Sequence, residues 1–372
     1  MDKLPASTPV SFYEKLYRSL VSILIIFLII FYGQHILIPI AFAALFALLL
    51  IAPSKLFERM GIARGLSALF STLLFIIVGF FIFYFISSQV VRFKADLPKL
   101  VDLFLAGIDE LEAWITSKFN ISTTSIDEFL HNATTKTLSN PSALIGTTVG
   151  TVSGTLVYMI LIPIYTFLLL YYRGLIVKFF IQVFPSKHST TVLEVLEKIR
   201  FVIKGYITGL VIEMIIVAIM NCTGFLILGV KYAILLGVIA ALLNVIPYLG
   251  ILAACIISLL ITSTTNTPGV VLGMAIVMVG VHLIDSNIIL PKVVGSKVKI
   301  NVLATLLAVL AGSAIWGIPG MFLSIPIIAI LKIVFDAVDG LQPWGLLIGE
   351  DTKRKTPKKR LNWKSFFTAK TK

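Results

Sequence analysis

Long apolar segments divide this chain and give the first prediction about its fold. No Asp, Glu, Lys or Arg occurs in five stretches, at residues 19–54, 65–91, 137–172, 232–284 and 300–331. Each stretch is longer than the roughly 20 residues that a helix needs to cross about 30 Å of hydrocarbon. The pattern predicts an all-α integral membrane protein, with about six full transmembrane helices and two broken or re-entrant helical hairpins.

The six full spans are predicted at 18–32, 36–52, 66–90, 145–172, 206–228 and 269–290. The first two form a hairpin that turns at residues 33–35. A signal peptide is the alternative for the first span, because residues 41–43 (Ala-Phe-Ala) resemble a cleavage site. The hydrophobic run continues past that site to Ala52, which favours a retained hairpin.

Two apolar stretches are interrupted in the middle. Residues 233–263 contain Asn244, Pro247 and Gly250, and residues 301–333 are broken at 316–320 (Trp-Gly-Ile-Pro-Gly). Each arm has about 13–14 residues, or roughly 20 Å of helix, which is too short to cross. Either both segments cross fully or both are re-entrant. The lysines at 292, 297 and 299 would be cytoplasmic only in the second case, which the positive-inside rule favours.

Charge predicts the orientation and the domain organisation. Lys3, Lys15 and Arg18 place the N-terminus in the cytoplasm, and residues 352–372 carry nine Lys or Arg and no acid. We interpret this end as a cytoplasmic tail beside anionic lipid and not as a nucleic-acid arm. The predicted regions are a three-span region (1–91), an external amphipathic helical segment (92–143), a fourth span with a cytoplasmic amphipathic helix (144–205), a transport core (206–336) and the basic tail (337–372).

The external segment carries an apolar stripe with heptad spacing. Its members are Leu97, Val101, Phe104, Ile108, Leu111 and Ile115. Such a stripe is typical of a helix that lies on the membrane or on its own domain, or of a contact between subunits of a homo-oligomer. Gly146, Gly150 and Gly154 open the fourth span at intervals of four, which predicts close helix packing.

Ionisable groups within the apolar segments are few, so each is a candidate for function. Glu213 lies in the middle of the fifth span, and His282 and Asp285 lie three residues apart near the end of the sixth. This spacing suits proton exchange or cation coordination, although Asp285 is near enough to the interface to reach water. The predicted pathway comprises Asn244, Pro247, Tyr248, Gly250, Glu213, His282, Asp285, Asn287, Trp316, Gly317, Pro319 and Gly320.

Enzymatic functions are disfavoured. The chain contains no zinc-binding His-Glu-x-x-His, no Gly-x-Ser-x-Gly nucleophile turn and no phosphate-binding Gly-x-x-x-x-Gly-Lys-Ser/Thr loop. Its four histidines are scattered, and its two cysteines lie in apolar segments. We therefore expect no cofactor, no metal site and no nucleic-acid partner.

Several motifs resemble the autoinducer-2 exporter family. They are the stretches 229–232 (Gly-Val-Lys-Tyr), 244–250 (Asn-Val-Ile-Pro-Tyr-Leu-Gly), Asp285-x-Asn287, 291–295 (Pro-Lys-Val-Val-Gly) and 317–321 (Gly-Ile-Pro-Gly-Met), with Pro163 and 165–167 in the fourth span. The resemblance covers roughly residues 156–336 and implies a bacterial inner-membrane transporter that forms homo-oligomers. Members are associated with export of autoinducer-2 or with sodium/proton antiport. Two departures are residues 300–301 (Ile-Asn), where many members have a His-Pro-like pair, and 171–173 (Tyr-Tyr-Arg), where an acidic end is usual.

Together these features predict a secondary transporter for a small polar solute or a monovalent cation, coupled to a proton or sodium gradient. No ATP-binding motif is present to drive transport. The alternative is a membrane scaffold that does not transport and recruits partners through its external helix and basic tail.

Overall fold

The structure is a computed structural model that describes residues 12–119, 157–246, 249–295 and 299–350. Its elements in this part of the chain are helical, apart from one isolated bridge between Ile300 and Gly349. The longest are α2 (Gln34–Arg59), α3 (Arg64–Phe119), α7 (Ser189–Ile227) and α11 (Val302–Ala337). The others are α1 (Phe12–Tyr32), a helix at Val157–Tyr171, α6 (Arg173–Val183), η1 (Ser186–His188), α8 (Ala233–Leu243), α9 (Leu249–Thr265), α10 (Pro268–Ile284), the turns η2 (Asp285–Ile289) and η3 (Pro291–Gly295), and α12 (Gln342–Ile348).

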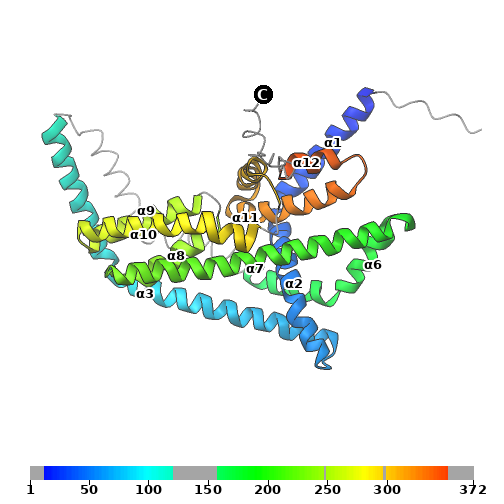
Figure 1. Cartoon of the computed structure of the whole chain (residues 1–372), viewed down its shortest axis with the longest axis horizontal. Helices are drawn as coiled ribbons and strands as arrows, with labels where there is room; N and C mark the ends of the chain where they lie inside the picture. The colour runs from blue at the N-terminus through cyan, green and yellow to red at the C-terminus, as the bar shows by residue number, and fades with distance from the viewer. Residues whose placement is uncertain (1–11, 120–156, 247–248, 296–298, 351–372) are drawn as a thin grey trace, which may run out of the picture.

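Enough of these helices are long and apolar to confirm an all-α integral membrane protein. Within the described residues, five helices meet the length and hydropathy of a membrane span. One of them, α11, is kinked at Gly317, and α1 is shorter than the other candidates. The number of candidate spans rises to six if Val157–Tyr171 and Arg173–Val183 are counted as one span that is bent by 67°. The chain breaks within the predicted turn 33–35, because α1 ends at Tyr32 and α2 begins at Gln34. The predicted hairpin of the first two spans is wrong, however, since the helix only bends at Gly33 and α1 and α2 extend in different directions from it (Figure 1).

Two predicted helix boundaries are absent. The third span and the start of the external segment are one helix, α3, whose last part turns away from the rest in Figure 1. The cytoplasmic helix at 189–203 and the fifth span are likewise one helix, α7. Both boundaries were placed where polarity changes along the sequence. A change in polarity removes no backbone hydrogen bond, and α7 contains no proline, so the helix continues through it. The side chains of the heptad stripe, and residues 146, 150 and 154, lie outside the described part.

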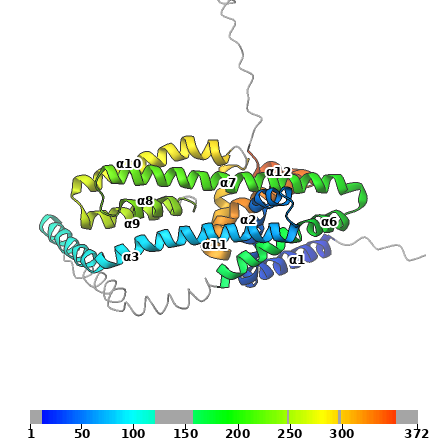
Figure 2. The same ribbon diagram turned by 90° about the horizontal axis from the view of Figure 1, so that it is seen from below.

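The segment 233–263 forms a hairpin of two short helices, as predicted. α8 and α9 lie between α3 on one side and the pair α7 and α10 on the other (Figure 2). A Cβ atom on Gly250 would collide with the carbonyl of Leu243, so glycine permits the turn between the two arms. At the open end, Asn266 Nδ2 donates to the carbonyl of Gly229 at 3.2 Å. Both ends of the hairpin therefore lie together.

The segment 301–333 also folds back on itself. The backbone of α11 is non-helical at Gly317, where φ is 62° and ψ is −139°. A Cβ on Gly312 would collide with the carbonyl of Gly320. Eight residues of straight helix rise about 12 Å, so this contact requires the two arms to be antiparallel. Asn301, at the start of α11, donates through Nδ2 to the carbonyls of Leu347 and Gly349 beyond its end.

The fourth span bends next to Arg173. This residue begins α6, and its Nη2 lies 2.7 and 2.6 Å from Oε1 and Oε2 of Glu58 near the end of α2. Both side chains are largely shielded from solvent, with 20% and 26% of their surfaces exposed. Arg173 is one of the departures from the family pattern, and here it joins α6 to α2.

Candidate functional site

Three polar side chains that are far apart in the sequence meet inside the bundle. Asn244 Nδ2 donates to Asp285 Oδ2 at 2.9 Å and to Glu213 Oε1 at 3.3 Å. Glu213 and Asp285 are each only 4% exposed. One amide therefore bridges two buried carboxylates. We call Glu213, Asn244 and Asp285 the carboxylate cluster.

Each member of the carboxylate cluster is positioned by a specific local feature. Glu213 lies on the buried face of α7, one turn before Val217. Asn244 directly follows the last residue of α8, at the tip of the first hairpin. Asp285 begins η2, a π-helical turn at the end of α10. Such turns often occur at functional sites, because the wider turn displaces side chains from the regular helical positions.

The carboxylate cluster has too few donors for two ionised groups. Glu213 Oε2 and Asp285 Oδ1 are buried and have no hydrogen-bond partner within the described chain. No ion pair in that part of the chain involves either residue. Two adjacent buried carboxylates are strongly unfavourable unless a proton or a cation neutralises at least one of them. Their two free oxygens and the proton-binding capacity of both groups make the cluster suited to binding and releasing a small cation.

Two further predicted residues, His282 and Asn287, lie within one turn of Asp285 on either side of it. His282 is half-buried one turn earlier on α10, and its Nδ1 is shielded without a partner among the described groups. Asn287 is exposed and donates through Nδ2 to the carbonyl of Leu283 at 2.8 Å. The structure thus places the unpartnered ring nitrogen of His282 one turn from Asp285, whereas the side chain of Asn287 is occupied by a backbone carbonyl.

The tip of the second hairpin lies against a different part of the molecule. Trp316 Nε1 donates to the carbonyl of Ile30 in α1 at 2.9 Å. Gly317 forms the kink, and Gly320 lies against Gly312. The helices that contact α11 are α1, α2, α7 and α12. Trp316 also packs beside Ile203 and Tyr206 of α7. Among the described residues, no hydrogen bond joins the second hairpin tip (Trp316, Gly317, Pro319 and Gly320) to the carboxylate cluster. Pro247 and Tyr248 are outside the described residues.

One buried polar residue on α7 was not among the predicted pathway residues. Asn221 is 4% exposed, and its Oδ1 has no partner in the part of the chain that the structure describes. It follows Glu213 by eight residues, or about two turns, and lies on the same buried face. Polar residues spaced by about two turns on an otherwise apolar helix are the sequence signal that could have identified it.

The described residues contain no group of three His, Cys, Asp or Glu that could hold a metal ion. The carboxylate cluster has two acidic members, each with one buried oxygen that has no hydrogen-bond partner in the described chain.

Comparison with known proteins places these features in a family. Residues 20–340 match the profile described as AI-2E family transporter. YueF of Bacillus subtilis is 26% identical over 284 residues, which cover 74% of this chain and 76% of the relative. PerM of Escherichia coli K12, named as a permease, is 24% identical over 328 residues, with 83% and 89% covered. YrrI of Bacillus subtilis is 33% identical over a shorter region of 129 residues. These names assign transport by inference and specify no substrate. Since the match spans most of its length, the chain belongs to the AI-2E family of membrane transporters.

Proposed function

We propose that this protein is an ion-coupled secondary transporter and that the carboxylate cluster binds the coupling ion, a proton or Na⁺. The observation that carries the proposal is the single amide between two buried carboxylates, two of whose oxygens have no partner. Such a pair is stable when it holds a cation and unstable when it is empty. Ion binding therefore lowers the free energy of the conformation in which Asn244 holds the two carboxylates together.

The position of Asn244 supports a link between the ion and movement. Asn244 lies at the tip of a hairpin, whereas Glu213 and Asp285 lie on α7 and α10, so the hydrogen bonds join three elements. Irregular backbone within a membrane occurs where protein buries it or water lines it. Displacing the hairpin tip would break both bonds and expose the carboxylates to the pathway. Binding an ion would favour one position of the tip over the other.

The cargo is a small polar solute, such as the autoinducer-2 signal, or the cation itself in exchange for protons. The proposed setting is the bacterial inner membrane with both termini in the cytoplasm. Membership of the transporter family supports this class of function. The carboxylate cluster, as the proposed binding site of a proton or Na⁺, supports the gradient of that ion as the source of energy for transport.

Proton exchange can test the proposal without knowledge of the solute. The purified protein is reconstituted into liposomes that contain a pH-sensitive dye, and NaCl, LiCl or KCl is added outside under a clamped membrane potential. We expect Na⁺ to change the internal pH in the wild type and not in Glu213→Gln or Asp285→Asn, since each variant removes one ionisable group of the pair. Glu197→Gln, an exposed acid on the same helix, is the matched control and should exchange normally.

The results separate the alternatives clearly. Equal exchange by the wild type and both cluster variants would remove the cluster from ion binding. A wild type that is inactive both with these salts and with a panel of small polar solutes would favour a scaffold over a transporter.

A further inference from the structure

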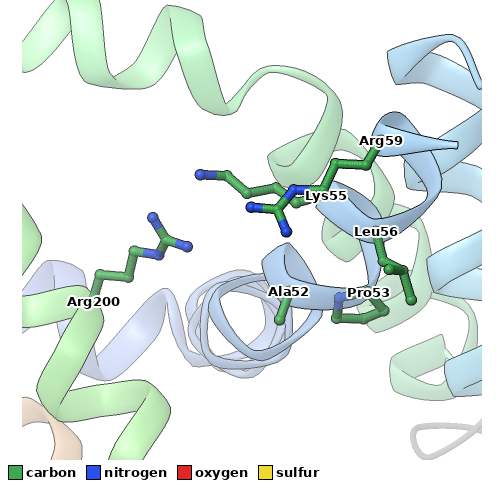
Figure 3. A pocket seen from close by; sticks show the side chains of 6 residues that line it. All are labelled: Ala52, Pro53, Lys55, Leu56, Arg59 and Arg200. Atoms are coloured by element: carbon green, nitrogen blue, oxygen red, sulfur yellow. The ribbon is translucent and has the colours of Figure 1, made fainter. Parts of the chain in front are cut away.

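A cationic pocket lies at the far end of α2, on different helical segments from the carboxylate cluster. The cavity has a volume of about 560 Å³ and is lined by Ala52, Pro53, Lys55, Leu56 and Arg59 of α2 and by Arg200 of α7. Figure 3 shows the charged ends of Lys55, Arg59 and Arg200 directed towards the same open space. We call this cavity the basic pocket.

The crossing of α2 and α7 creates the basic pocket. The two helices pack through an apolar cluster that includes Leu45 of α2 and Ile203 of α7. Beyond this cluster the helices separate, as Figures 1 and 3 show, and the next turns of each line the cavity. Arg200 is one turn before Ile203, so the apolar contact fixes its distance from the end of α2.

The positive charges of the basic pocket are not neutralised by nearby acids. Glu58 is the one acid in the last two turns of α2, and Arg173 already binds both of its oxygens. Across the described residues, Lys55, Arg59 and Arg200 form no ion pair. Glu194 and Glu197 line a neighbouring cavity together with Lys198, Phe201, Lys204 and Arg200, where cations also outnumber acids.

Helix electrostatics explain part of this arrangement. Cations near the C-terminal end of a helix interact favourably with its dipole, which accounts for Lys55 and Arg59 on α2 alone. The dipole of α2 does not explain why Arg200, from the middle of a different helix, faces the same cavity. Three convergent cations repel one another, so an anion between them would lower the free energy of the folded state.

The surroundings point to a lipid as the source of the anion. Arginine side chains bind phosphate oxygens through paired N–H donors. Ala52, Pro53 and exposed Leu56 provide an apolar surface beside the cations, which a free phosphate ion does not need. The pocket also lies where the apolar run of α2 ends and charged residues begin, the level at which headgroups occur. We propose that the basic pocket binds the phosphate headgroup of an anionic phospholipid.

The positive-inside rule predicts that this end of α2 is cytoplasmic. The cytoplasmic leaflet carries anionic lipid, so the ligand is present on the side that the pocket would face. A lipid held between α2 and α7 would connect α2 to the helix that carries Glu213.

Lipid binding to the purified full-length protein tests this proposal. Native mass spectrometry measures binding of phosphatidylglycerol and of phosphatidylcholine to the wild type and to the triple variant Lys55→Gln/Arg59→Gln/Arg200→Gln. Each cation contributes about a fivefold change in affinity for an anionic surface, so the triple variant should bind phosphatidylglycerol roughly a hundredfold more weakly. The charge-matched control is Lys178→Gln/Lys187→Gln/Lys198→Gln, whose three lysines are exposed and lie outside the basic pocket.

Each outcome is decisive. Loss of phosphatidylglycerol binding in the triple variant, with retention in the control, would support the pocket. Equal loss in the control would assign binding to overall charge and overturn it, as would equal binding by all variants. Glycerol 3-phosphate is added in a separate arm. If it displaces the lipid at millimolar concentration and binds the wild type alone, the ligand is a soluble phosphate and the lipid assignment is wrong. Thermal unfolding of every variant establishes that it is folded.

Discussion

The hydrogen bonds of Asn244 give the sharpest prediction about the carboxylate cluster. Asn244→Leu replaces the amide with an apolar side chain of similar volume and removes both donors, at 2.9 Å to Asp285 and 3.3 Å to Glu213. A hydrogen bond to a charged group contributes about 1.5–3 kcal/mol, and the longer of these two bonds contributes less. We therefore expect a loss of roughly 2–4 kcal/mol in unfolding free energy when the carboxylates are ionised.

The loss of unfolding free energy in Asn244→Leu should depend on pH, and the direction of the hydrogen bonds determines whether the loss is larger at high or at low pH. The Asn244 amide donates to the carboxylates, so it stabilises their ionised forms. At low pH the protonated acids can donate hydrogen bonds themselves, and the loss falls to about 1 kcal/mol. The difference between wild type and Asn244→Leu should therefore increase as the pH rises through the range in which the two carboxylates ionise. Denaturant titrations in mixed micelles at several pH values measure this difference.

Asn221→Leu is the matched control for this experiment. Asn221 has the same side chain and lies in the same bundle, where it is more deeply buried than Asn244, but it forms no hydrogen bond with Glu213 or Asp285. Its substitution should change stability by an amount independent of pH. A pH-independent loss in Asn244→Leu, equal to that of Asn221→Leu, would refute the view that the amide stabilises a pair of ionisable carboxylates.

Two further substitutions test the packing of the bundle. Gly237→Ala should destabilise the protein by about 1–3 kcal/mol in a thermal-unfolding assay. The new Cβ would lie 2.5 Å from Cys222 Sγ and 2.7 Å from Cys222 N, so α7 and α8 would have to separate. Gly280→Ala is the control and should be neutral or stabilising, because its Cβ meets no atom within 4 Å. Arg173→Glu should lower the melting temperature, because it removes the ion pair with Glu58. The double exchange Arg173→Glu/Glu58→Arg should restore part of the lost melting temperature. A double variant no more stable than the single one would show that the pair does not join α6 to α2.

Much of the fold could be predicted because a lipid environment leaves few choices. Every backbone group in hydrocarbon must be hydrogen-bonded within the protein, so long apolar stretches become helices. The same constraint makes interruptions informative. The breaks at Asn244 and at Gly317 were predicted from proline and glycine, and the structure has a hairpin at each. The continuous helices α3 and α7 were missed, since polarity along a helix changes without altering its backbone.

The candidate site was likewise predictable in part: its residues could be identified from the sequence, but their contacts could not. The sequence by itself identified Glu213, Asn244 and Asp285 as separate candidates, because polar groups are costly in an apolar segment. Their distances in sequence, 31 and 41 residues from Asn244, contain no information about contact. Only the tertiary structure decided that one hairpin tip reaches both carboxylates while the other, at Trp316, bonds to α1. The physical reason is that the chemistry of a residue is local, whereas the position of a hairpin tip depends on how whole helices pack.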